Sequence, residues 1–155
     1  MKVRLVYGVG ALLYLIALGA MFLPAMRGMT RTTIEISGRQ GRPCLGTVWQ
    51  QGSTPRALML IGHGVTSNQG IMALLAKSFA QNGYVAVAFD FWGHGRSRER
   101  FDWFANPDQI RAWVAWAREE YPGLPVAYLG HSMGGFSGGD TFNKEPIVDA
   151  FVSLG

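Results

Sequence analysis

Cysteine and histidine are both rare in this sequence of 155 residues, which has one cysteine and three histidines. A single cysteine, Cys44, permits no internal disulfide and so does not indicate an oxidising or a reducing compartment. No neighbouring base or motif supports Cys44 as a nucleophile, and we expect it to be an ordinary strand residue. Each histidine adjoins a glycine, so a shared metal ion would require at least two of them to leave tight turns. We therefore expect no metal ion, and the sequence implies no organic cofactor.

Charged residues are also few, at 15%, while hydrophobic residues make up 48%. This composition excludes an intrinsically disordered chain, and the 21 glycines follow no Gly-X-Y period, which excludes collagen. Residues 1–42 carry six basic side chains and one acidic, whereas the remainder carries eight basic and nine acidic. Because a nucleic-acid-binding domain needs Lys and Arg clustered on its folded part, we expect no nucleic acid as a partner.

The longest stretch without charge runs from Leu5 to Met26. About 20 apolar residues in a helix, at roughly 1.5 Å each, span the ~30 Å hydrocarbon core of a bilayer. We therefore predict a single-pass N-terminal membrane anchor through residues 5–26. Residues 1–31 are then the anchor and its exit, and residues 32–155 are the folded domain.

Basic residues flank this run on both sides. They bear on whether the run is an anchor or a signal peptide, and on its orientation in the membrane. Lys2 and Arg4 would also suit a cleaved signal peptide, but the run is long for one and has no clear A-x-A cleavage site, which favours the anchor. Lys2 and Arg4 favour a cytoplasmic N-terminus, whereas Arg27 and Arg31 oppose it. We interpret the balance as an extracytoplasmic location for the folded domain.

Beyond residue 31, hydrophobic runs alternate with helical patterns. Two β-rich runs at residues 32–37 and 45–50, separated by Gly and Pro, predict an antiparallel pair. Continuous apolar runs predict further strands that are buried on both faces, at residues 57–61, 84–89, 126–129 and 150–154. Strands that alternate with helices predict an α/β fold with a mostly parallel sheet.

Two helices are expected between the buried strands. The apolar positions of the first recur at helical spacing, at Ile71, Leu74, Leu75 and Phe79. In the second we expect Asn106 to be the N-cap and Pro107 the first helical residue. The apolar stripe of the second helix, which contains Trp113, could form a ligand cage, but packing against a sheet is the simpler interpretation.

One serine lies in a pattern typical of nucleophiles. Gly130-His131-Ser132-Met133-Gly134 matches G-x-S-x-G, and it directly follows a predicted strand. A nucleophile elbow needs this context, in which a strand runs into a sharp turn and then a helix. Ser137 fits the same pattern but lies inside the expected helix, so we assign Ser132 as the nucleophile. Gly130 and Gly134 are needed because the turn brings strand and helix close together.

A serine nucleophile also needs donors for the oxyanion that forms during its reaction. One donor is expected from the backbone N–H after the nucleophile, which belongs to Met133. The second is expected from the loop after the third strand, where His63-Gly64-Val65 follows the run at 57–61. We assign this second role to the N–H of Val65.

Three motifs in this order make the sequence resemble the α/β-hydrolase family, and more narrowly its serine aminopeptidase and monoacylglycerol-lipase-like branch. They are His63-Gly64, Asp90-Phe91-Trp92-Gly93-His94-Gly95-Arg96-Ser97 and Gly130-His131-Ser132-Met133-Gly134-Gly135. The resemblance covers residues 32–155. It implies a three-layer fold that acts on a small-molecule or lipid acyl substrate, and a structural role for the second motif. Arginines at positions 96, 98 and 100 could clamp an anionic substrate, but a solvated loop is the simpler interpretation.

The resemblance further implies a catalytic acid and then a histidine base after the nucleophile. No histidine follows Ser132, and His63, His94 and His131 all belong to the three motifs. We therefore expect the sequence to stop after about the sixth of eight strands, without its acid, its base and the cap over the site. The favoured interpretation is a serine hydrolase of which these 155 residues are an incomplete and inactive part. The alternative is a non-catalytic, membrane-tethered binding or scaffold protein with the same fold.

Overall fold

Leu12 and residues 28–155 are the part of the chain that the computed structural model describes. They form a six-stranded sheet in the order β1-β2-β4-β3-β5-β6. The strands are β1 (Met29–Ser37), β2 (Pro43–Gln51), β3 (Ala57–Gly62), β4 (Tyr84–Phe89), β5 (Val126–His131) and β6 (Ala150–Leu154). The strands β3 to β6 are parallel, and β2 runs antiparallel to both β1 and β4. The predicted α/β fold with a mostly parallel sheet is confirmed.

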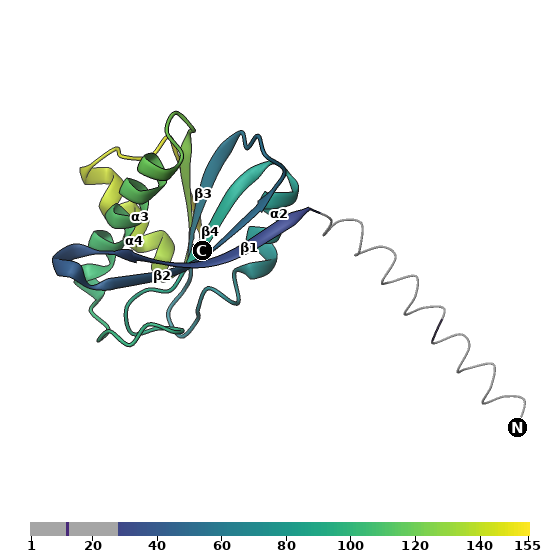
Figure 1. Cartoon of the computed structure of the whole chain (residues 1–155). Helices are drawn as coiled ribbons and strands as arrows, with labels where there is room; N and C mark the ends of the chain where they lie inside the picture. Colours follow the sequence, from purple (N-terminus) through teal and green to yellow (C-terminus); the bar gives the residue numbers. More distant parts are fainter. Residues whose placement is uncertain (1–11, 13–27) are drawn as a thin grey trace, which may run out of the picture.

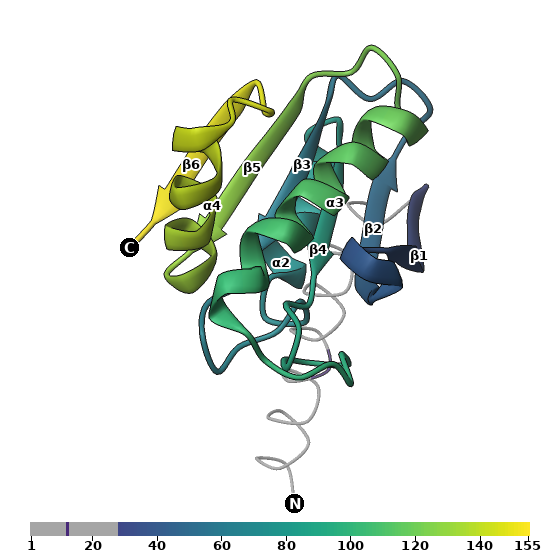
Figure 2. The same ribbon diagram turned by 90° about the vertical axis from the view of Figure 1, so that its left-hand side faces the viewer.

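Helices cover both faces of this sheet (Figure 1, Figure 2). Helix α2 (Ala73–Gln81) lies on one face, and α3 (Asn106–Glu120) and α4 (Met133–Lys144) lie on the other. Successive side chains of a strand point to opposite faces, so each central strand contributes to both layers of the core. In β3, Leu58 and Leu60 pack in the cluster with α3, whereas Met59 and Ile61 pack in the cluster with α2. Two hydrophobic cores therefore hold three layers together.

The tryptophan stripe of α3 is part of the core. Trp113 is fully buried and its ring stacks on Phe89 of β4, with the ring centroids 5.5 Å apart. Gly46 of β2 leaves room for this ring, since a Cβ at that position would lie 2.6 Å from Trp113. The simpler interpretation of the stripe, packing against a sheet, is confirmed.

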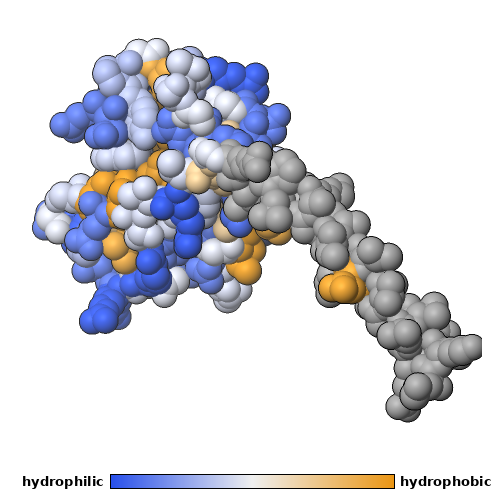
Figure 3. Space-filling model, turned by 45° about the vertical axis from the view of Figure 1, so that its right-hand side comes forward, coloured by the Kyte–Doolittle hydropathy of each residue, from blue (hydrophilic) through white to orange (hydrophobic). Residues whose placement is uncertain are grey.

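The predicted membrane anchor at residues 5–26 lies outside the described residues, apart from Leu12. Among the helices that the structure describes, none is both long enough and apolar enough to cross a bilayer. Strand β1 begins at Met29, three residues before the predicted strand, and pairs with Gln51 there. The face of the molecule in Figure 3 is mostly hydrophilic, and hydrophobic residues reach it in separate patches.

Two local predictions are wrong, at Asn106 and at residues 150–154. Asn106 is the first residue of α3 and not its N-cap, because its side chain is buried and donates a hydrogen bond to Ser137 Oγ at 3.1 Å. The first expected helix is present as α2, although it begins after Ile71, and its face against the sheet is formed by Ala76 and Ala80. The run at 150–154 is exposed throughout, because β6 is an edge strand.

Candidate active site

Ser132 is the single residue between β5 and α4, and it forms a sharp turn. Its φ of 50° and ψ of −112° lie in a region that residues with a Cβ rarely adopt. Two hydrogen bonds hold the turn: the Ser132 N–H donates to Leu154 O at 2.8 Å, and the Phe136 N–H donates to Ser132 O at 2.9 Å. The residue is exposed. The strand, the turn and the helix are thus all present around this serine.

The two glycines of the pentapeptide lie where the strand and the helix meet. A Cβ on Gly130 would overlap the backbone of Gly134. A Cβ on Gly134 would lie 2.7 Å from Gly62 O and 2.9 Å from His63 O. The Gly134 N–H donates to His63 O at 3.1 Å, which fastens the start of α4 to the end of β3. Only glycine fits at these positions without a shift of the backbone.

Ser137, the second serine that fits the pentapeptide pattern, lies within α4 as expected. It is 2% exposed, and its hydroxyl accepts a hydrogen bond from the buried Asn106 amide. Its carbonyl oxygen also accepts a hydrogen bond from Thr141 Oγ1 at 2.7 Å. Because its side chain is almost fully buried and its hydroxyl is held by Asn106, Ser137 is not an exposed nucleophile like Ser132.

The loop after β3 lies against the turn at Ser132. A Cβ on Gly64 would lie 3.4 Å from Ser132 Cβ and 3.0 Å from His131 Nδ1. The next residue, Val65, is 51% exposed. Within the described residues, neither the Val65 N–H nor the Met133 N–H donates a hydrogen bond. Two free backbone donors therefore lie near the serine, one on the residue after it and one in the loop that contacts the turn.

His63 joins this loop to the loop after β4. Its Nε2 accepts a hydrogen bond from the Phe91 N–H at 3.1 Å, so the proton of the neutral ring lies on Nδ1, which donates to Gly64 O at 2.7 Å. The residue is fully buried, and desolvation lowers its pKa, although the Gly64 carbonyl and the charge of Asp90 oppose this shift. Both ring nitrogens are occupied. His63 therefore supports the loop and is not available to take a proton from Ser132.

The other two histidines also lack a carboxylate partner. His94 Nδ1 is 3.2 Å from Trp92 O, and the ring packs against Phe101 at a centroid distance of 5.0 Å. His131 Nδ1 is buried and has no hydrogen-bond partner in the described part of the chain. In a catalytic triad a carboxylate orients the histidine base through such a hydrogen bond. None of the histidines of this chain has that arrangement among residues 28–155.

The motif that begins at Asp90 forms a buried network of hydrogen bonds. The Asp90 carboxylate is 1% exposed and accepts three hydrogen bonds, from the Gln69 N–H, from Gln69 Nε2 and from the Arg96 N–H, at 2.7 to 3.0 Å. Gly95 has a φ of +56°, and a Cβ there would overlap the carboxylate. This network holds the loops after β3 and β4 together, in agreement with the structural role that the resemblance implied.

Gln69 was not singled out from the sequence, yet it connects three elements. Besides its bonds to Asp90, its Oε1 accepts a hydrogen bond from Thr47 Oγ1 of β2 at 2.6 Å. It is only 6% exposed. No sequence pattern marks it, because its partners lie on other elements. It fixes the same loop that carries Val65.

The remaining chemically versatile residues do not form a second reactive centre. Cys44 is buried in β2, as expected of a strand residue, and burial raises the pKa of its thiol. Glu99 pairs with Arg42 at 2.8 Å, while the arginines beside it in the loop are exposed. Across the residues that the structure describes, no three His, Cys, Asp or Glu side chains lie close enough to hold a metal ion.

Solved structures with the same fold include an esterase from Pyrococcus furiosus and a carboxyl esterase from Bacillus coagulans. The TM-score is 0.71 for each, at 21% and 17% identity. The matches cover 79% and 80% of this chain and 50% and 44% of those chains. The sheet order and the elbow at Ser132 thus define an α/β-hydrolase fold.

The family described as serine aminopeptidase, S33, matches residues 53–155, and the chain belongs to this family of α/β-hydrolases. It is 32% identical over 114 residues to a monoacylglycerol lipase of Mycolicibacterium smegmatis, and the match covers 71% of this chain and 41% of that protein. It is 36% identical over 91 residues to the human monoglyceride lipase, and this match covers 56% of this chain and 30% of that protein. The resemblance stated from the motifs is confirmed, and the chain spans less than half the length of these relatives.

Proposed function

We propose that Ser132 attacks the carbonyl carbon of an acyl ester, thioester or amide, and that the N–H groups of Val65 and Met133 bind the oxyanion. The exposed turn of Ser132, with two free backbone donors near it, is the observation that carries this proposal. The attack forms an acyl-serine and expels the alcohol, thiol or amine. Water then attacks the acyl-serine, releases the acid and restores the hydroxyl.

This reaction needs a base that accepts the proton of Ser132 Oγ. His63 is excluded by its two hydrogen bonds, and neither His94 nor His131 is oriented by a carboxylate in the described structure. We therefore assign no base among these 155 residues. The proposal places the acid and the base in chain that follows Gly155, in the order that the family follows.

The surface beside the turn suits an apolar acyl group. Phe136, one helical turn after Ser132, is 65% exposed, and its ring lies 5.6 Å from that of Trp103. These two rings and Phe104 line a pocket of about 360 Å³. Because exposed aromatic rings favour contact with hydrocarbon, a small-molecule or lipid ester is the proposed substrate class. The names of the lipase relatives point in the same direction.

The proposed location is a membrane. The uncharged run from Leu5 to Met26 would serve as the anchor, with the folded domain on the extracytoplasmic side. A protease-protection assay on intact cells tests this: the folded domain should be cleaved by added protease without lysis, and protection until lysis would reverse the orientation.

The test of the enzyme proposal is to read the coding DNA past Gly155 and to assay the protein encoded by the whole reading frame. An acid and then a histidine in frame, with hydrolysis of p-nitrophenyl esters that Ser132→Ala lowers by about 10³-fold or more, would support it. Ser78→Ala, at an exposed serine of α2, is the matched control and should retain full activity. A reading frame without the two residues, or hydrolysis that survives Ser132→Ala, would favour the non-catalytic scaffold.

A further inference from the structure

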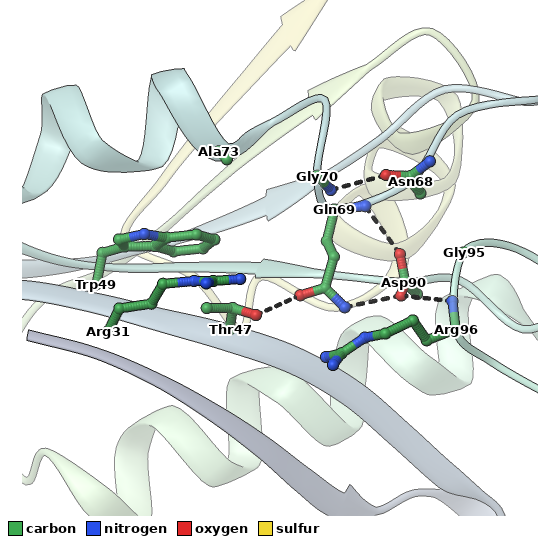
Figure 4. A pocket seen from close by; sticks show the side chains of 10 residues that line it. All are labelled: Arg31, Thr47, Trp49, Asn68, Gln69, Gly70, Ala73, Asp90, Gly95 and Arg96. Carbon is green, nitrogen blue, oxygen red and sulfur yellow. Dashed lines mark hydrogen bonds between the residues drawn. The ribbon is translucent and has the colours of Figure 1, made fainter.

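A second pocket lies on the α2 side of the sheet and shares no lining residue with the Ser132 turn (Figure 4). Its volume is about 400 Å³. The lining comes from β1, β2, the loops after β3 and β4, and the start of α2: Arg31, Thr47, Trp49, Asn68, Gln69, Gly70, Ala73, Asp90, Gly95 and Arg96. Most of these residues are polar, which distinguishes this pocket from the aromatic one beside Ser132.

Two guanidinium groups enter the pocket. Arg31 from β1 and Arg96 from the loop after β4 extend into it from opposite sides (Figure 4). Neither forms a salt bridge with a carboxylate of the described residues, whereas four other arginines do: Arg39, Arg42, Arg111 and Arg118. Arginine prefers to bind planar or tetrahedral oxyanions through several N–H groups at once. Two uncommitted guanidiniums in one pocket therefore favour an anionic ligand.

Asp90 is the one carboxylate in the lining, and it does not neutralise both arginines. Its oxygens are occupied by Gln69 and by the backbone N–H of Arg96. The lining thus contains two guanidinium groups and one carboxylate, and the carboxylate has other partners. Its net charge is positive.

Trp49 forms an aromatic wall of the pocket. The residue is 2% exposed and lines the pocket. The guanidinium of Arg31 lies 5.9 Å from the centroid of its indole ring. The indole N–H is buried away from solvent, so it offers no donor to a ligand in this structure.

We propose that this pocket binds a phosphate group, held by Arg31 and Arg96. Phosphate offers more acceptor oxygens than a carboxylate, which suits a site with donors on several sides. The volume exceeds that of phosphate alone, so the ligand is a phosphate ester, either a soluble phosphomonoester or the headgroup of a phospholipid. A headgroup is within reach if residues 5–26 lie in a bilayer, because Arg31 follows closely after Met26. Binding at this pocket does not depend on any reaction at Ser132.

The experiment measures binding of radiolabelled inorganic phosphate and of glycerol 3-phosphate to the full chain by equilibrium dialysis, at constant ionic strength. In dodecyl maltoside micelles, which contain no phosphate, both should bind with saturation. The same measurement in nanodiscs of phosphatidylglycerol separates the two sources. If glycerol 3-phosphate still binds in the nanodiscs, the ligand is a soluble phosphate ester. If the phosphatidylglycerol blocks its binding, the ligand is the lipid headgroup.

Two variants and one control test the residues. Arg31→Gln and Arg96→Gln should each weaken phosphate binding in micelles by about tenfold or more, since each removes a charged donor. Arg98→Gln is the matched control, an exposed arginine of the same loop that does not line the pocket. Its affinity should equal that of the unmodified chain.

Three results would overturn the proposal. The first is the absence of saturable phosphate binding below about 10 mM in micelles, a concentration that corresponds to a Kd too weak for a specific site. The second is equal affinity in the unmodified chain and in Arg31→Gln or Arg96→Gln, with far-ultraviolet circular dichroism showing that the variants are folded. The third is acetate binding as tight as that of phosphate, which would assign the pocket to carboxylates.

Discussion

The hydroxyl of Tyr128 in β5 donates a hydrogen bond to the carbonyl oxygen of Gly134 in α4, over a distance of 3.0 Å. Tyr128 is fully buried, and desolvation raises its pKa far above the usual value, so the hydroxyl keeps its proton and remains a donor. This bond connects the strand before Ser132 with the helix after it. It therefore links the two elements between which the strained turn lies.

Removing that bond should destabilise the fold. Tyr128→Phe is expected to lower the free energy of unfolding by about 1 to 2 kcal/mol, because a buried polar pair is lost while the ring remains. Urea denaturation at low protein concentration measures this. Tyr84→Phe is the control, since no hydrogen bond of its hydroxyl is found within residues 28–155. An equal loss in both variants would mean that the bond to Gly134 contributes nothing specific.

Added methyl groups at the elbow should disrupt it. Gly130→Ala and Gly134→Ala each place a Cβ against backbone, so we expect losses of about 3 kcal/mol or more in the free energy of unfolding. Gly139→Ala, in the same helix, meets only Phe151 at 4.0 Å and should be neutral or stabilising by up to about 1 kcal/mol. Thermal or urea unfolding distinguishes the three variants, and comparable losses at all three positions would refute the steric explanation.

Acid should weaken the fold through His63. Its folded-state pKa lies below the ordinary value of 6.5 because of burial, so the unfolded chain takes up the proton first as the pH falls. The free energy of unfolding should therefore decrease below about pH 6.5. His63→Gln should show a flatter dependence between pH 7 and pH 5. An NMR titration of the His63 ring gives a second measurement, and a midpoint at or above 6.5 would contradict the prediction.

The 155-residue chain by itself should show little or no ester hydrolysis that depends on Ser132. Without a base the hydroxyl is a weak nucleophile, although the free backbone donors would remain. Hydrolysis of p-nitrophenyl butyrate by the chain and by Ser132→Ala is the measurement. A rate that falls in Ser132→Ala would show that a base is present after all, and His131, beside the serine, would then be the first residue to test.

Strand β6 should make the same chain self-associate. All five of its residues are exposed, and one of its edges has no partner strand in the described sheet. An exposed, apolar edge strand tends to pair with another chain. Val152→Lys should lower the aggregated fraction in sedimentation velocity, because a lysine at an edge opposes such pairing. Leu74→Lys, at a still more exposed leucine on α2, is the control; the same reduction there would show that general hydrophobicity is the cause.

The central strands and the elbow could be predicted because their signals are local. Each of β3, β4 and β5 is a continuous apolar run, and the pentapeptide around Ser132 follows such a run directly. The need for glycine at position 130 reflects contacts with Gly134 and Gly135, which lie within a few residues of the serine. Sequence patterns record interactions of this range well.

The contacts that position the loops could not be predicted, because they join residues on different elements. Gln69 meets Thr47 and Asp90, and Asn106 meets Ser137, through side chains that no periodicity marks. The exposure of β6 is likewise a property of its place at the sheet edge. Its apolar sequence alone predicts burial.

The hydrogen bond from the Ser132 N–H to Leu154 O also has a consequence for the time at which the elbow forms. A ribosome releases the chain from its N-terminus, so Ser132 emerges well before Leu154. Until β6 has been synthesised and has joined the sheet, the strained turn lacks one of the two bonds that hold it. The nucleophile therefore reaches its final shape only after β6 has joined the sheet.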